Sequence, residues 1–278
     1  FAKLSDGVID FMSQYTFSNF VLGMKTAGFI SNKLINSQMT LDFAYTLYLL
    51  LNNDPTIERS QIKHYVAKWF VMSTLTSRYI GSPESQMDFD IRRIREKGFM
   101  TFFKEVEEAE LSDTFWNVGL VQNLETQVIN SPFFNVFLAA QIYEGNNALF
   151  SNGTKVGYLI TLMGDVHHIF PKQYLRKNGY DEKRLYNQIA NFTYLDTQVN
   201  KGISDDAPNV YFKNAIEACK NGKTLYGNIA DTATLRQNLQ ENCIPESIVD
   251  MDYSNYPDFL ASRRKLMTKK IQNYYKNL

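Results

Sequence analysis

The sequence contains few cysteines, and their positions exclude two classes of structure. Cys219 and Cys243 are the only cysteines among 278 residues, and they are too far apart to form a CxxC pair. This spacing argues against a thiolate zinc site and against a framework of disulfides. We therefore expect a reducing compartment, the cytoplasm.

The sequence also lacks an excess of charge of either sign. Lys plus Arg and Asp plus Glu both number 29, so the formal net charge is zero. Proteins that bind nucleic acid usually carry a basic excess. The overall composition therefore gives no support to nucleic-acid binding, and any such surface has to come from local patches.

No stretch has the character of a membrane span or of a secretion signal. The uncharged stretch 126–143 is long enough for a span, but it contains Pro132 and several amides and suits a buried helix better. The start of the chain lacks a basic-then-apolar leader. We expect no contact with a membrane. Because position 1 is Phe rather than Met, we also expect the chain to be part of a longer protein.

Apolar and aromatic residues are plentiful, and they predict an ordered, mainly α protein. Hydrophobic residues make up 44 % of the chain and aromatic residues 14 %. Apolar residues recur at helical spacing in the first part, for example at Leu41, Ala44, Tyr45 and Tyr48. We expect a helical domain over residues 1–150, a module of different character over 151–212, and a C-terminal helical segment over 213–278 that ends in a basic stretch.

The pattern between residues 151 and 212 indicates two short strands and a helix. An apolar run at Tyr158–Met163 leads into a segment with two histidines, and Ile189–Leu195 is the second strand candidate because it is rich in β-favouring residues. Asp196 can cap a short helix that starts at Thr197 and that Gly202 would end. The expected order is strand, long loop, strand, helix.

Two adjacent histidines are the most informative residues of the chain. On a strand, neighbouring side chains point to opposite faces, so Asp165 and His167 would share one face and could hold a cation. His168 would then approach a different atom of a substrate. Asn191 lies at the second strand, and Asn200 lies on the short helix. A neutral imidazole can activate water, and a divalent ion can neutralise charge on a phosphate, so these residue types suit phosphodiester hydrolysis.

These residues resemble the HNH nuclease motif, in which an acidic residue precedes His-Ile-x-Pro and is followed by an Asn and then by an Asn or His on a helix. Residues 165–171 read Asp-Val-His-His-Ile-Phe-Pro, and Asn191 and Asn200 match the later positions. The resemblance implies a helical protein that carries a small ββα-metal nuclease module, and an endonuclease activity. It implies that His168 is the general base and that Asn191 holds the loop that aims it. It also implies that His167, Asn200 and Asp165 bind the metal.

The identity of the metal depends on His167. Many HNH nucleases have Asp or Glu at the position of His167. An imidazole ligand suits Mn, Ni, Co or Zn better than Mg. We expect a divalent metal, Mg or Mn, with Ni, Co and Zn as alternatives because of His167.

A wider resemblance covers most of the chain. Residues 68–79, the Gly81–Ser85 turn and the segment after it are similar to the C-terminal half of GmrSD-type restriction endonucleases, which are modification-dependent systems of bacteria. The resemblance implies a bacterial anti-phage nuclease that acts on double-stranded DNA with modified bases. It also implies a ParB-like NTPase domain preceding this region, and the present chain contains no Walker-type GxxxxGK[ST] sequence.

Basic residues near the motif are the expected DNA contacts. A cluster in the loop next to the histidines lies close to the phosphate to be cleaved, and Lys201 follows Asn200. The residues that we expect to contact the DNA backbone are Lys172, Arg176, Lys177 and Lys201. The basic C-terminal stretch has two interpretations, a solvated helix face or a phosphate-tracking surface; it comprises Arg263, Arg264, Lys265, Lys269, Lys270 and Lys276.

Other interpretations of the same residues stay open. Adjacent histidines can be structural, and an Asp after a Gly, such as Asp165, is as often a turn residue. Asn200 alone would be an ordinary amide on a helix surface. The alternative functions are a catalytically silent HNH fold that binds DNA or assists assembly, and an HNH nuclease that cleaves RNA. Further from the motif, we expect surface ion pairs on one helix among Asp88, Asp90, Arg92 and Arg93.

Overall fold

The computed structural model describes residues 2–162 and 166–278, and its side chains from Gly7 onward. Helices account for 69 % of the described residues. The described residues contain two short strands, which pair with each other. The prediction of a mainly α protein is confirmed.

Serine caps start two of the N-terminal helices: the Ser13 hydroxyl accepts a hydrogen bond from the N–H of Thr16 (3.3 Å), and that of Ser37 accepts one from Thr40 (3.2 Å). The long helices of this part are α1 (Ala2–Met12), α2 (Gln14–Thr26), α3 (Gln38–Asn52), α4 (Ile62–Thr76), α5 (Pro83–Lys97), α6 (Phe99–Glu110) and α8 (Pro132–Tyr143). The short helical segments are η1 (Asn32–Leu34), η2 (Arg59–Gln61), η3 (Phe115–Gly119) and α7 (Leu120–Asn123).

The second part of the chain combines short helices with the two strands. It begins with α9 (Val156–Leu162), β1 (His167–His168), α10 (Lys172–Lys177), α11 (Lys183–Tyr186), η4 (Ile189–Asn191), β2 (Phe192–Thr193) and α12 (Thr197–Ile203). It continues with α13 (Pro208–Lys220), α14 (Thr232–Glu241), η5 (Glu246–Asp250), η6 (Tyr253–Asn255) and α15 (Tyr256–Asn277).

Helix α4 is the centre of the N-terminal core. Trp69, Val71 and Met72 are all fully buried, although consecutive positions leave a helix in different directions. The helix packs against α2, α3, α6 and α8. A helix that is covered on several sides has no wide polar stripe, which explains the apolar character of this segment.

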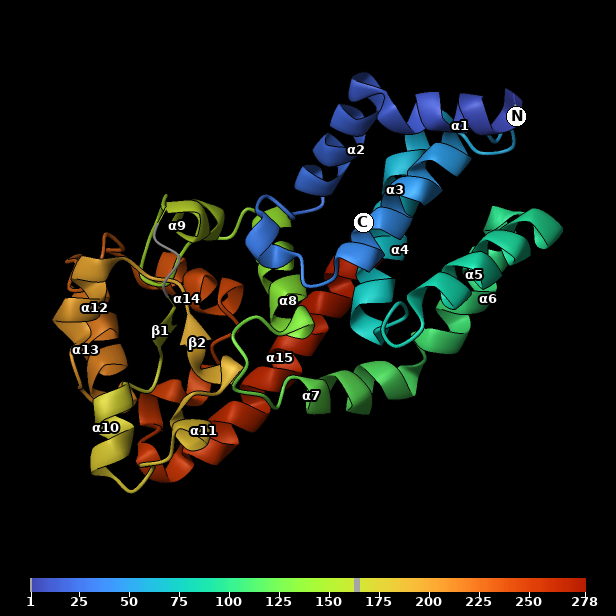
Figure 1. Ribbon diagram of the computed structural model, residues 1–278. Coiled ribbons are helices and arrows are strands. Elements are labelled where there is room, and N and C mark those ends of the chain that lie inside the picture. Colours follow the sequence, from blue (N-terminus) through green and yellow to red (C-terminus); the bar gives the residue numbers. More distant parts are fainter. Residues whose placement is uncertain (1, 163–165) are drawn as a thin grey trace.

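Helix α15 connects the two parts of the molecule. In Figure 1 it runs as the red helix from the region of the strands toward α4. Near its C-terminal end, the Tyr274 hydroxyl donates to the carbonyl of Ala27 (2.5 Å), and the carbonyl of Leu278 bonds the ring of His64 on α4. Nearer its N-terminal end, Arg263 reaches the segment that contains β2. The strands are therefore packed onto the same helix that closes the N-terminal core.

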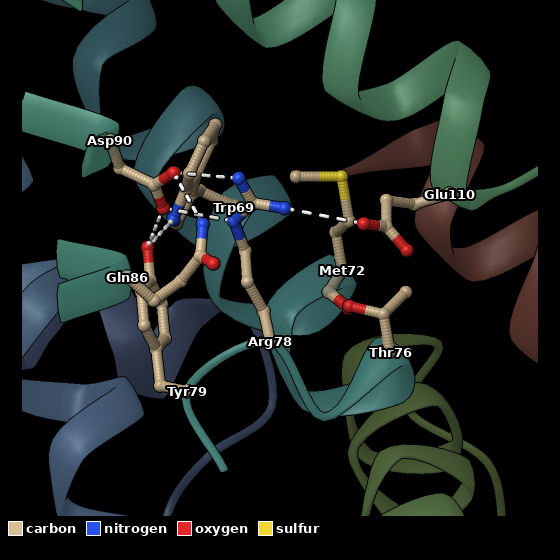
Figure 2. A network of polar contacts seen from close by, with 8 residues as sticks. All are labelled: Trp69, Met72, Thr76, Arg78, Tyr79, Gln86, Asp90 and Glu110. Atoms are coloured by element: carbon tan, nitrogen blue, oxygen red, sulfur yellow. Dashed lines mark hydrogen bonds and ion pairs between the residues drawn. The ribbon is translucent and has the colours of Figure 1, made fainter. Parts of the chain in front are cut away.

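A buried ion pair fastens α5 to the end of α4. Figure 2 shows Arg78, Tyr79 and Gln86 converging on the carboxylate of Asp90. Arg78 donates from Nη2 (2.6 Å) and Nε (2.9 Å), Tyr79 donates its hydroxyl (2.8 Å), and Gln86 donates its amide (2.9 Å). The Asp90 side chain is completely buried. Four donors around one carboxylate compensate for its removal from water.

The prediction that Asp90 belongs to a surface ion pair is therefore wrong. Its neighbours on the same helix behave as predicted, since Asp88 and Arg92 form an exposed pair at 3.2 Å. Arg93 also forms a surface ion pair on this helix, with Glu96 (3.0 Å). The ion-pair partner of Asp90 is Arg78, which precedes helix α5. The spacing of charges along one helix therefore could not predict this pair.

The apolar run at 158–162 forms helix α9 and not the predicted strand. Val156, Leu159 and Ile160 are buried, whereas Tyr158 and Leu162 are exposed. This spacing is that of one helical face, and an alternating strand would bury Tyr158 together with Ile160 and Leu162. Residues 163–165 lie outside the described residues.

The second predicted strand, Ile189–Leu195, is shorter than expected. Its first residues form the turn η4, and only Phe192 and Thr193 pair as strand β2. The short helix α12 begins at Thr197 as predicted, and the Asp196 carboxylate accepts from the N–H of Gln198 (2.8 Å). The order strand, loop, strand, helix is present over residues 167–203.

The basic C-terminal stretch is not uniformly a solvated face. Arg263 is only 1 % exposed, and Tyr274 and Tyr275 are buried as well. For Arg263, both interpretations of this stretch, a solvated face and a phosphate-tracking surface, are therefore wrong. Within the described ranges 2–162 and 166–278, no helix combines the length and the apolar character needed to cross a membrane.

Candidate functional site

The two histidines lie on the first of two antiparallel strands. His167 pairs with Thr193, and His168 pairs with Phe192. The pairing continues beyond the strands, because the N–H of Ile169 donates to the carbonyl of Asn191 (2.8 Å). The histidines are thus held against the segment that carries Asn191, although more than 20 residues separate them along the chain.

Asn191 is completely buried and binds the backbone of the segment that follows the histidines. Its Oδ1 accepts from the N–H of Phe170 (2.8 Å), and its Nδ2 donates to the carbonyl of Phe170 (3.1 Å). The same amide also donates to the carbonyl of Tyr186 (3.2 Å). One side chain therefore ties the end of β1 to the loop between the strands. These are the contacts required of a residue that holds a loop in place.

His168 is half-buried in an aromatic setting. Its ring meets that of Phe192 edge-on at 5.1 Å, and its Nε2 lies 2.9 Å from Oδ1 of Asn187. With that oxygen as acceptor, Nε2 carries the ring proton and Nδ1 is the nitrogen with a free electron pair. Burial lowers the pKa of His168; the Asn187 bond opposes this, and the charges of Lys172 and His167 add to the lowering. The neutral, basic form of the imidazole is favoured.

Asn187 is a residue that the sequence analysis missed. It closes the short helix α11, and its side chain is the described hydrogen-bond partner of the His168 ring. An Asn four residues before Asn191 gives a weak signal, because asparagine is common in loops. Only the folding of α11 back toward β1 brings it to the histidine.

The expected metal ligands come from two stretches of the chain, 165–167 and the helix that carries Asn200. His167 lies on β1 and is partly exposed, and Asn200 lies on α12 and is also partly exposed. Asp165 lies outside the described residues. Among the residues that are described, no group of three or more His, Cys, Asp or Glu side chains is placed to hold a metal. The donor set of an imidazole and an amide oxygen suits a divalent ion that accepts both nitrogen and oxygen.

Helix α10 places basic side chains directly after the histidine strand. It begins after Pro171, and Lys172, Arg176 and Lys177 are all exposed on it. Lys172 lies over the ring of Tyr186 at 5.3 Å, while Lys177 pairs with Asp205 at 2.5 Å. The fourth expected DNA contact, Lys201, is exposed on α12. Lys172 and Arg176 are one helical turn apart, so they share a face of α10.

Hydroxyl groups from distant helices bind further carbonyls of this region. Tyr211 of α13 is completely buried and donates to the carbonyl of Ile169 (2.6 Å). Tyr256 of α15 donates to the carbonyls of Leu185 and Tyr186 (3.2 Å each). Burial raises the pKa of both tyrosines, so both remain hydrogen-bond donors at neutral pH. The loop between the strands is therefore held by residues far away in the sequence.

Replacing Asn191 by alanine is expected to lower the free energy of unfolding by about 2–4 kcal/mol, because buried backbone groups of Phe170 and Tyr186 would lose their partners. Urea unfolding of the variant and the wild type measures the difference. Asn221→Ala is the matched control, since the bonds of this exposed side-chain amide in the described structure both go to Glu217, one helical turn earlier. A loss for Asn191→Ala no larger than that of the control would contradict the role assigned to its amide.

The comparisons with known proteins leave this geometry without a named family. No family model matches the chain, and no solved structure matches it. A protein of Methanocaldococcus jannaschii that is described only as uncharacterized is 30 % identical over 165 residues. The match covers 56 % of this chain and 26 % of that protein. The chain therefore spans about a quarter of the length of this relative, whose description states no activity.

Proposed function

We propose that this chain is a metal-dependent DNA endonuclease of the HNH type. The observation that carries the proposal is the bonding of Asn191 to both backbone groups of Phe170, with His168 on the strand that leads into Phe170. His168 and Asn191, which the HNH resemblance names from two distant stretches of sequence, lie on neighbouring segments of the chain. A pair of buried structural histidines would not require this arrangement.

In the proposed reaction, His168 acts as the general base. Its Nδ1 takes a proton from water, and the resulting hydroxide attacks the phosphorus while the bond to the leaving 3′-oxygen breaks. Asn187 keeps the proton on Nε2, and Phe192 restricts the plane of the ring. His167 and Asn200, with Asp165, would hold a divalent ion that neutralises charge on the phosphate and on the leaving oxygen.

The proposed substrate is double-stranded DNA, with Lys172, Arg176 and Lys201 on its phosphates. Lys177 would have to exchange its bond with Asp205 for a phosphate. By resemblance to GmrSD-type enzymes, we further propose that modified bases are the target and that a ParB-like NTPase domain is the partner. A bacterial cytoplasm is the corresponding location.

The proposal is tested by incubating the protein with supercoiled plasmid in Mg²⁺, Mn²⁺, Ni²⁺ or EDTA. Plasmid with unmodified cytosine, phage DNA with modified cytosine and an RNA of equal length are compared. We expect nicking or linearisation of DNA that requires a metal. Cleavage of RNA alone would replace the proposal with an RNA nuclease. Absence of cleavage with tight metal-independent DNA binding would indicate a silent HNH fold.

Replacing Asn187 by alanine is expected to slow cleavage by about 10- to 100-fold, a loss of the size found when the hydrogen-bond partner of a metal-binding histidine is removed. The ring of His168 would lose the bond that selects its tautomer. Single-turnover cleavage at saturating DNA measures the effect, again with Asn221→Ala as the control. A rate equal to that of the wild type would remove Asn187 from the site.

A further inference from the structure

Arg263 of α15 is a buried cation in an unusual environment. It is 1 % exposed, and in the described part of the chain its guanidinium meets carbonyl oxygens and no carboxylate. Burial lowers the pKa of Arg263 to about 10, so the side chain is still charged at neutral pH. A charge buried without a counter-ion is costly, and it has to be stabilised by well-placed dipoles.

Arg263 binds one carbonyl of the second strand, that of Phe192 in β2, and one carbonyl of the helical segment η4 that leads into the strand, that of Ala190. Nη1 donates to the carbonyls of Ala190 (2.9 Å) and Phe192 (2.6 Å), which flank Asn191. The carbonyl of Asn191 itself faces the other way and accepts from the N–H of Ile169. In extended backbone, alternate carbonyls point to opposite edges. Arg263 therefore occupies the place where a third strand would supply N–H groups.

The next outward carbonyl along that edge is bonded as well. The carbonyl of Tyr194 accepts from the N–H of Leu149 (3.1 Å), two residues after Phe192, as the alternation of extended backbone requires. The second amino group of Arg263 donates to the carbonyl of Asn242 (3.2 Å), just beyond α14. A two-stranded sheet is marginal alone, and its open edge needs partners. Here the guanidinium of Arg263 donates two hydrogen bonds to carbonyls beside Asn191, and a third to the carbonyl of Asn242 at the end of α14.

We propose that Arg263 is a positioning residue of the nuclease site: it fixes the outer edge of the second strand so that Asn191 and the strand of His168 stay in register. This inference rests on the proposed nuclease function. Arg263 acts through the segment 190–192, whose carbonyls it binds. A rigid fork with several donors is required, and the single ammonium of lysine does not reproduce it.

The test compares Arg263→Lys and Arg263→Met with Arg78→Lys. Arg78 is also a buried arginine, but it lies in the N-terminal core and binds Asp90. Each folded variant is examined by amide hydrogen exchange and by single-turnover cleavage at saturating DNA. Circular dichroism and thermal unfolding establish that the variants are folded, and Arg263→Lys retains the charge if Arg263→Met does not fold.

We expect Arg263→Lys to accelerate exchange in peptides covering 166–172 and 189–195 by about 10- to 100-fold, because hydrogen bonds from a charged donor are lost. Peptides of α3 and α4 should be unchanged. The cleavage rate should fall by about 10-fold or more while the dissociation constant for DNA stays the same. Arg78→Lys should show the opposite pattern, with faster exchange in α4 and α5 and an unchanged cleavage rate.

Two outcomes would overturn the proposal. One is exchange in 166–172 and 189–195 that stays at the wild-type level in Arg263→Lys. The other is faster exchange there with an unchanged cleavage rate, which would make the role of Arg263 only structural. If the wild type cleaves nothing, the proposed function itself fails, and the exchange pattern still decides whether Arg263 holds the strand pair.

Discussion

Replacing His168 by alanine is expected to abolish DNA cleavage while the protein stays folded. A positioned general base accelerates a reaction by about 100- to 10,000-fold, so the rate should fall by a factor in this range. The fold should tolerate the change, because His168 is only half-buried and its side chain makes one hydrogen bond, to Asn187, and ring contacts with Phe192 and Tyr186. Single-turnover cleavage and thermal unfolding measure the two effects separately.

His64 offers a matched control for this experiment. It is a partly buried histidine of α4 that bonds the carbonyl of Leu278, in the N-terminal core. His64→Ala should keep the wild-type cleavage rate of the folded protein. Binding of DNA without cleavage should be unchanged in His168→Ala. If His168→Ala cleaves as fast as the wild type, the assignment of the general base is wrong, and with it the main support for the nuclease.

Local sequence patterns predicted the helical part of the fold well. Apolar residues at helical spacing identified α3 and α4, because one repeating face suffices for a helix. The same evidence misassigned 158–162, where a short apolar run fits a strand or a helix equally well. The burial of Val156, Leu159 and Ile160 against the rest of the core decides in favour of the helix. That choice depends on tertiary contacts, which no short window contains.

In the candidate site too, some residues could be identified from the sequence and others only from tertiary contacts. His167, His168, Asn191 and Asn200 could be singled out because they stand at motif spacings along the chain. Arg263 could not be linked to them, because its partners beside Asn191 lie 73 and 71 residues away and are backbone carbonyls, which every residue type has. In the sequence, Arg263 cannot be distinguished from the exposed basic residues near it; only the packing of α15 shows that its side chain is buried.

Asp90 was misassigned for a related reason, and it gives the second large effect. Asp90→Ala is expected to lower the free energy of unfolding by about 3–5 kcal/mol, because removing one member of a buried ion pair leaves an uncompensated charge. Arg78, whose side chain is 8 % exposed, would keep Glu110 at 3.3 Å as its ion-pair partner and the ring of Trp69 at 5.5 Å, and Glu110 itself is 40 % exposed. Tyr79 and Gln86 would lose their acceptor as well. Urea unfolding at neutral pH measures the loss.

Asp88 is the control for Asp90, since it lies on the same helix and pairs with Arg92 on the surface. Asp88→Ala should cost less than about 1 kcal/mol, as exposed pairs do. Equal losses for the two variants would mean that the network in Figure 2 contributes no more than a surface ion pair. The fraction of Asp90→Ala that is folded should cleave DNA at the wild-type rate, because none of its lost contacts reaches the strands. Asp90→Ala would then lose stability and keep activity, whereas His168→Ala would lose activity and keep stability, and the two variants together would separate the N-terminal core from the chemistry.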